Sequence, residues 1–180
     1  MQHFQKPILL FLFFLLTACC HAQTKKIDGL FAQLKKTKVS SERLNVILSI
    51  CNEYQSLNRD TLMNLAVEAR TLAASQSNKE KKGLAALALS NAYMQWGWAD
   101  SALAVLEPVL VNENEYAKSI YFKMQRIYAM IYGSRANYEK ALSILYPSLS
   151  GAEKWKDTLN MAAIMNSIGS VNIAMEKTEE

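Results

Sequence analysis

The side chains that most often carry out catalysis or bind metal ions are scarce in this sequence. Both histidines, His3 and His21, lie before Gln23, and Cys51 is the single cysteine after position 20. The chain from Gln23 onward therefore has no general acid–base group that titrates near neutrality, no Ser-His-Asp or Cys-His pair and no histidine for a zinc site. One cysteine can form neither an internal disulfide nor a thiolate metal site.

Other reactive patterns are missing as well. The six glycines are scattered and form neither GxxxxGK[ST] nor GxGxxG. The acidic residues lie where helices and turns place solvated charges, although carboxylate-only catalysis stays open as an alternative. Acidic and basic residues are interspersed, so no basic stripe for nucleic acid appears. We predict a protein that is not an enzyme, has no cofactor or metal and binds no nucleic acid. Trp96, Trp98 and Trp155 are expected to pack between helices, with a sugar- or base-stacking platform as the alternative.

Residues 1–22 are expected to be an export signal. Lys6 precedes the apolar run Ile8–Leu16, which is far shorter than the roughly 20 residues of a membrane-spanning helix. The triplet before Gln23 suits cleavage by signal peptidase. The four residues ending at Cys19 instead suit a lipoprotein signal, in which that cysteine would be lipidated and would anchor the chain to a membrane. Both routes predict an exported domain over residues 23–180.

An internal repeat with a period of roughly 40 residues organises that domain. The blocks ALAVLEPVL (102–110) and ALSILYPSL (141–149) agree at five of nine positions with an offset of 39. Apolar residues recur at helical spacing, and β-type alternation is absent. Units about 43–82, 83–121 and 122–161 follow, with a partial unit at 162–180. The predicted helices cover residues 26–36, 42–56, 61–75, 79–96, 99–111, 116–133, 137–150 and 157–176.

Particular residues mark the ends of these helices. Asp60, Asn78 and Asp157 are predicted to cap the helices that follow them, because a side-chain oxygen can accept from free N–H groups in the first turn. Pro108 and Pro147 occupy the same late position in two second helices. Each proline predicts either a kink or a helix end, because its ring displaces one backbone hydrogen bond.

The repeat units resemble the tetratricopeptide-repeat (TPR) family. The family's usual period is about 34 residues, so these units are longer, and Ala136 stands where a turn glycine is preferred. The resemblance covers roughly residues 43–180. The residues that carry it are Leu89, Ser90, Tyr93, Gly97, Ala102 and Leu103 in one unit, Tyr128, Ala129, Tyr132, Tyr138, Ala141 and Leu142 in the next, and Ile168 and Gly169 in the last.

This resemblance implies an all-α fold of antiparallel helix pairs stacked as a right-handed solenoid, with the first helix of each pair lining a concave groove. The groove would bind a protein or peptide. Methionine adapts to varied partners, and lysine and arginine could hold a carboxylate. Ordinary packing of the methionines and solvation of the cations are the alternative. The implied groove residues are Leu84, Leu87, Asn91, Met94, Lys123, Arg126, Met130 and Asn166.

An exported array of this kind is similar to the N-terminal TPR region of sensor kinases and regulators in Gram-negative bacteria. The resemblance implies the extracytoplasmic sensory part of a signalling protein, or a truncated version of it. A free-standing adaptor, periplasmic or lipid-anchored, is the alternative. A carbohydrate- or peptide-binding enzyme fragment is a third option, which the lack of histidine disfavours. Contact with a membrane would come only from a lipid anchor or a missing downstream segment.

Overall fold

The computed structural model describes residues 25–111 and 113–179, and this part of the chain contains helices and no strand, which confirms the predicted all-α fold class. The expected export signal, including Cys19, lies outside the described residues. A helical segment at residues 25–36 comes first. The elements that follow are α2 (Ser40–Cys51), η1 (Tyr54–Ser56), α3 (Arg59–Ala74), α4 (Lys79–Gln95), α5 (Ala99–Leu110), η2 (Glu113–Glu115), α6 (Lys118–Ser134), α7 (Tyr138–Lys154) and α8 (Thr158–Glu179).

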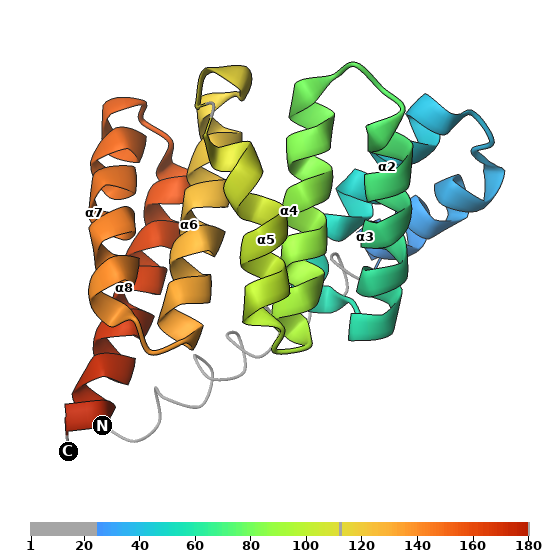
Figure 1. Ribbon diagram of the computed structural model, residues 1–180. Coiled ribbons are helices and arrows are strands. Elements are labelled where there is room, and N and C mark those ends of the chain that lie inside the picture. The colour runs from blue at the N-terminus through green and yellow to red at the C-terminus, as the bar shows by residue number, and fades with distance from the viewer. Residues whose placement is uncertain (1–24, 112, 180) are drawn as a thin grey trace, which may run out of the picture.

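The helices form a row of antiparallel pairs, α2–α3, α4–α5 and α6–α7, with α8 at the end (Figure 1). The first helices begin at Ser40, Lys79, Lys118 and Thr158, so their starting points are offset by 39, 39 and 40. The period inferred from the sequence blocks is therefore the period of the structure. It exceeds the usual TPR period in part because η1 and η2 are added after α2 and α5.

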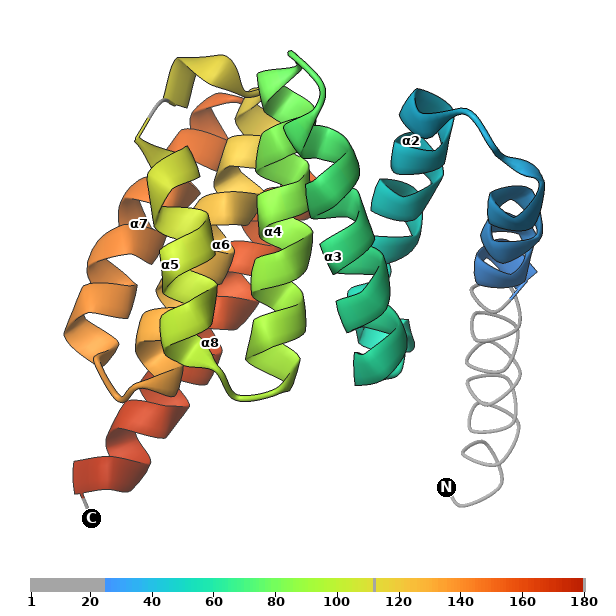
Figure 2. The same ribbon diagram turned by 45° about the vertical axis from the view of Figure 1, so that its right-hand side comes forward.

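Two layers result from this pairing. Each helix packs against the next along the chain, and the first helices α2, α4, α6 and α8 also contact one another in series. The second helices α3, α5 and α7 contact one another less. Because the first-helix layer is the tighter one, the row curves around it, and the inner surface of the molecule is built from first helices. Figure 2 shows the two layers from a second direction.

The hydrophobic core is divided into three clusters, which follow one another along the repeats. One buried cluster joins α2, α3 and α4, a second joins α4, α5 and α6, and a third joins α6, α7 and α8. Small residues allow the two helices of a pair to approach closely. Fully buried Ser90 on α4 donates a hydrogen bond to the carbonyl of Ala102 on α5 at 3.2 Å. The same crossing recurs on α6, where a Cβ built at Gly133 would lie 4.0 Å from that of Ala141 on α7.

Side-chain caps start several helices. Asn78 Oδ1 accepts from the Lys81 amide at 3.0 Å, and Asp157 Oδ1 accepts from the Asn160 amide at 3.1 Å, as predicted. The prediction for Asp60 is wrong. Asn58 caps α3 instead, accepting from the backbone N–H of its third helical residue at 2.8 Å. Asp60 lies within the first turn, where the helix dipole still favours a carboxylate.

The prolines do not act alike. α5 ends at Leu110, two residues after Pro108, whereas α7 continues to Lys154, well past Pro147. A helix end at Pro147 is therefore wrong. One lost hydrogen bond is offset there because the residues after the proline pack inward, with Ser148 buried and Ala152 fully buried.

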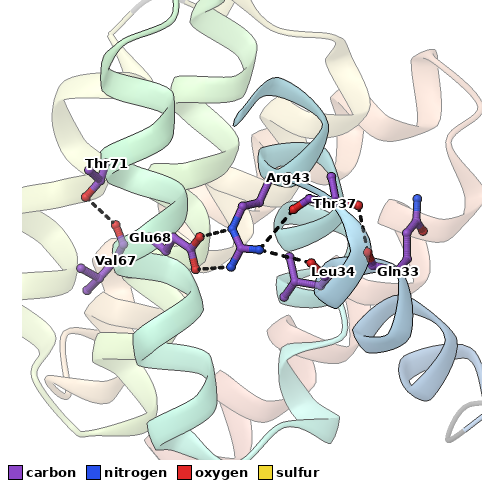
Figure 3. Close-up of polar contacts among 7 residues, drawn as sticks. All are labelled: Gln33, Leu34, Thr37, Arg43, Val67, Glu68 and Thr71. Atoms are coloured by element: carbon purple, nitrogen blue, oxygen red, sulfur yellow. Dashed lines mark hydrogen bonds and ion pairs between the residues drawn. The ribbon is translucent and has the colours of Figure 1, made fainter. Parts of the chain in front are cut away.

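An arginine joins the N-terminal helical segment to the first pair. The Arg43 guanidinium on α2 donates to both carboxylate oxygens of Glu68 on α3, with Nη2 at 3.2 Å from Oε2. Nη1 also donates to the carbonyls of Leu34, at 3.2 Å, and Thr37, at 3.5 Å (Figure 3). The planar guanidinium can serve a carboxylate and two carbonyls at once because its donors diverge. Residues 25–36 are thereby anchored to the array.

Candidate partner-binding groove

A groove with a volume of about 980 Å³ runs along the first-helix layer. Its lining comes from the helical segment 25–36, α2, the stretch around η1, α4 together with its cap, α6 and α8. None of the lining residues belongs to α3, α5 or α7. The groove therefore follows from the curvature of the array, because each first helix turns one face toward the same hollow.

The structure brings five of the eight predicted groove residues together. Leu84, Leu87 and Asn91 reach the groove from α4, and Lys123 and Arg126 reach it from α6. Lys123 and Arg126 lie one repeat after Leu84 and Leu87, so one first-helix face is presented again on the next helix. Whether these side chains bind a partner stays a prediction.

The other three predicted residues lie outside the groove lining. Met94 packs against the buried cluster between α4 and α6, and Met130 packs against the cluster between α6 and α8. These two partly buried methionines are packing residues, which is the alternative raised by the sequence. Asn166 is exposed on α8.

The contribution of α2 was not predicted, because its repeat unit is the most degenerate. Asn45 and Leu48 line the groove from α2, and Asn52 lines it just beyond the helix end. The missed signal is the repeat itself, since these positions precede Leu84, Leu87 and Asn91 respectively by one repeat. One column of equivalent positions lines the groove on all four first helices, namely Asn45, Leu84, Lys123 and Ala163.

The groove carries more cations than carboxylates. Lys26, Lys81, Lys123 and Arg126 line it, against two glutamates. The Lys26 ammonium forms an ion pair with one of them, Glu53, at 2.6 Å. Lys123 Nζ donates to Asn52 Oδ1 at 3.1 Å, which ties α6 to the turn after α2. The hollow therefore favours an anionic or acidic ligand, because unneutralised lysine and arginine attract opposite charge.

Arg126 has a distinctive environment in this hollow. Its Nε is buried and has no hydrogen-bond partner among the described residues. An unsatisfied buried donor costs roughly 1–3 kcal/mol, so groups of this kind are uncommon in folded proteins. A carboxylate or carbonyl entering the groove would supply the missing acceptor. Among the groove-lining residues, Arg126 is therefore the one with a buried hydrogen-bond donor that lacks an acceptor among the described residues.

The one cysteine of the described chain does not bring reactivity to the groove. Cys51 is buried within the cluster of α2, α3 and α4, as its apolar neighbours in the sequence predict. Burial raises the pKa of its thiol to about 12, because the thiolate would lose its hydration. The thiol therefore stays protonated at neutral pH and is a poor nucleophile.

The tryptophans behave differently from the prediction that all three pack between helices. Trp98 and Trp155 are half exposed or more, at 50% and 60%. Trp96 stacks on Trp98 with ring centroids 5.5 Å apart, and the Arg59 guanidinium lies 4.6 Å from the centroid of the Trp96 ring. The turn after α4 therefore holds a compact aromatic–cation stack with one ring facing solvent.

The described residues offer neither a metal cluster nor a membrane span. Within residues 25–111 and 113–179, no group of three or more histidine, cysteine, aspartate or glutamate side chains is placed to hold a metal ion. No helix in this part of the chain combines the length and hydrophobicity needed to cross a bilayer.

Comparison with known families identifies the repeat array. A family model described as the SusR N-terminal TPR domain matches residues 19–173, which runs from before the first helical segment into α8. This match confirms the resemblance to TPR proteins and agrees with the paired helices of the structure. No match was found among curated proteins.

Proposed function

Because this chain belongs to the family of SusR N-terminal TPR domains, we propose that it is a binding scaffold whose concave groove holds an acidic segment of a partner protein or peptide. TPR domains are generally non-catalytic scaffolds for protein interactions. What we propose beyond this is that the groove is the binding surface and that it selects an acidic segment. The single observation that supports it best is the buried, unpaired Nε of Arg126 inside a hollow lined by further cations.

The arrangement suits an extended ligand. The lining residues come from four successive first helices, so a bound segment would run across the repeats. Leu84 on α4 and Leu159 on α8 line the groove beside the cations, and the Leu159 side chain is 84% exposed. Apolar contacts would give affinity, and the charges would select acidic side chains or a terminal carboxylate.

Arg126→Met tests this proposal without removing the apolar stem of the side chain. We expect binding of the partner to weaken by about tenfold or more, since truncating a charged hot-spot residue commonly costs at least about 1.4 kcal/mol. The free protein should be equally stable or more stable, because an unsatisfied buried donor is removed. Capture from a cell-envelope extract, with quantitative mass spectrometry, measures the first effect, and urea denaturation measures the second.

The matched control is Lys140→Met, which removes one positive charge from an exposed position on α7, outside the groove. Partners of the parent protein should be retained by this control. If Arg126→Met and Lys123→Ala together retain the same partners as the parent, the cationic groove is not the binding surface.

We propose further that the scaffold works outside the cytoplasm, as the sensory part of a signalling protein or, alternatively, as a periplasmic or lipid-anchored adaptor. The apolar run after Lys6 and the family match support export. Mass spectrometry of the mature N-terminus separates a chain that starts at Gln23 from one lipidated at Cys19, and an unprocessed chain would contradict export. An in-frame membrane segment encoded downstream would favour the sensor over the adaptor.

A further inference from the structure

The positive charge of this chain is concentrated at one end of the array. Residues 25–38 contain five lysines and one aspartate, a net charge of +4. Residues 40–180 contain 14 basic and 15 acidic side chains, a net charge of −1. Charges are interspersed over the repeats, but the excess of positive charge comes from the helical segment before them. An asymmetry of this kind commonly marks a surface that contacts a polyanion or an anionic membrane.

The helical segment 25–36 packs by one face and turns the other to solvent. Leu30, Phe31 and Leu34 pack in the cluster of α2, α3 and α4. A stripe on the opposite face, at spacings of four, three and four residues, is exposed throughout and consists of Lys25, Gly29, Ala32 and Lys36. A Cβ built at Gly29 meets no atom within 4 Å, so the middle of this outward face is open.

The lysines on and beside the outward face are not neutralised by the fold. Lys26 differs from them, because it pairs with Glu53 toward the groove. No described residue forms an ion pair with any of the other four lysines of the segment, which are exposed, namely Lys25, Lys35, Lys36 and Lys38. Their combined field reaches roughly one Debye length, about 8 Å at physiological salt, so it acts on a surface that comes close.

These lysines are carried by an anchored helix. Arg43 Nη1 donates to the carbonyls of Leu34 and Thr37 at the end of the segment. Figures 1 and 2 show the segment, in blue, at the end of the row that lies away from α7 and α8. Its outward face is therefore presented in a fixed orientation and without obstruction from the repeats.

The composition of the outward face suits a lipid surface better than a nucleic acid. No arginine occurs in residues 25–38, so bidentate guanidinium–phosphate contacts are not available. The one aromatic ring of the segment, Phe31, packs against the core, so it offers no platform for a base. Lysines on long flexible stems suit the diffuse negative charge of phospholipid headgroups.

We propose that the outward face of segment 25–36 binds the surface of an anionic phospholipid membrane, with Lys25, Lys35 and Lys36 at the headgroups. The order of the chain supports this proposal. Lys25 follows Cys19 by six residues, a span of at most roughly 20 Å. In the lipidated alternative the lysines therefore lie near the bilayer, where a basic patch strengthens the hold of a lipid anchor. This contact does not require the lipid and was not predicted from the sequence.

The probe is a set of vesicles made of phosphatidylglycerol and phosphatidylcholine in equal parts, with vesicles of phosphatidylcholine alone as the uncharged reference. Protein that begins at Gln23 has no lipid at Cys19 and keeps every residue that the structure describes. We expect this protein to sediment with the anionic vesicles at low ionic strength and not with the uncharged ones. Added salt should release it, because the Debye length shortens.

The triple variant Lys25→Gln, Lys35→Gln and Lys36→Gln should bind the anionic vesicles about a hundredfold more weakly. Each lysine near an anionic membrane surface contributes roughly fivefold to the affinity. The side chains are exposed, so the fold is retained, and an unchanged urea midpoint checks this.

The matched control removes the same charge from exposed positions on α7 and the turn after it, through Lys140→Gln, Lys154→Gln and Lys156→Gln. This control should bind the vesicles as the parent does. Arg126→Met should also bind them as the parent does, so the membrane contact and the groove are tested separately.

Three results would overturn the proposal. The first is a parent protein that does not sediment with anionic vesicles. The second is a triple variant that keeps the affinity of the parent, or loses no more affinity than the matched control. The third is equal or tighter binding of the parent to soluble polyphosphate at the same phosphate concentration, which would assign the lysines to a soluble polyanion instead of a membrane.

Discussion

Gly97 and Ala136 occupy the same left-handed turn in successive repeats, with φ of 75° and 57°. The residue after each donates its amide to a tyrosine carbonyl near the end of the preceding helix, at 2.9 Å to Tyr93 and 3.0 Å to Tyr132. The turn is therefore conserved in geometry although only one of the two positions is glycine. A Cβ in this region of backbone space is strained by its own carbonyl.

Ala136→Gly should raise the free energy of unfolding by about 1 kcal/mol, since relief of left-handed strain exceeds the added chain entropy. Gly97→Ala should lower it by a similar amount, because nothing but backbone strain opposes the new methyl group there. Urea denaturation of the two variants measures both effects. Equal and unchanged midpoints would show that the strain is absorbed elsewhere.

Gly83→Ala should destabilise the protein by about 1–3 kcal/mol through overpacking. Its Cβ would lie 2.4 Å from Cε1 of Tyr116 and 2.8 Å from Cε of Met124. The methionine can move, but the tyrosine ring is buried and cannot. Gly169→Ala is the matched control on α8, where the added methyl group meets nothing within 4 Å and should stabilise the helix by about 0.5–1 kcal/mol.

Arg43→Lys should destabilise the N-terminal part of the array by about 1 kcal/mol, because lysine keeps the charge but cannot reproduce the paired contact with Glu68 and the two carbonyl contacts. Faster amide hydrogen exchange in residues 25–36 should accompany this loss. Arg70→Lys, at an exposed position on α3, controls for the substitution itself. Unchanged exchange in the segment would mean that its apolar contacts suffice to hold it.

Cys51 makes stability depend on alkaline pH. Its thiol titrates near 9.0 when solvated and near 12 in the fold. Between these values the unfolded chain releases the proton and the folded chain keeps it, so the free energy of unfolding falls as pH rises. Below about pH 9 this contribution is fully present.

Comparison of the parent with Cys51→Ala isolates the effect, because the titrations of Tyr116 and Tyr128, whose pKa values burial also raises, are common to both. The stability difference between the two proteins should shrink as pH rises from 9 toward 12. A constant difference would contradict the assigned role of burial. In the folded parent, the thiol should also resist alkylation at neutral pH.

The repeat blocks at 102–110 and 141–149 were enough to predict helices, their pairing and the period, because a helix pair can bury its apolar stripe only against neighbouring pairs. The same register locates groove positions such as Leu84 and Lys123. The residues at which helices begin were harder to predict from the sequence. Asn58 and Asp60 are both good caps, and only the path of the chain out of η1 decides between them.

Tertiary structure alone decided which first-helix residues face the groove and which are covered. Met94 and Met130 lie on the same helices as their groove neighbours, but their partly buried side chains pack against the core clusters instead. The exposure of Gly169 also has no sequence signature, since Ser90 and Ala129, the small residues at the equivalent positions, are buried. Local spacing determines which side of a helix is apolar, whereas the packing of neighbouring helices determines how much of that side remains exposed.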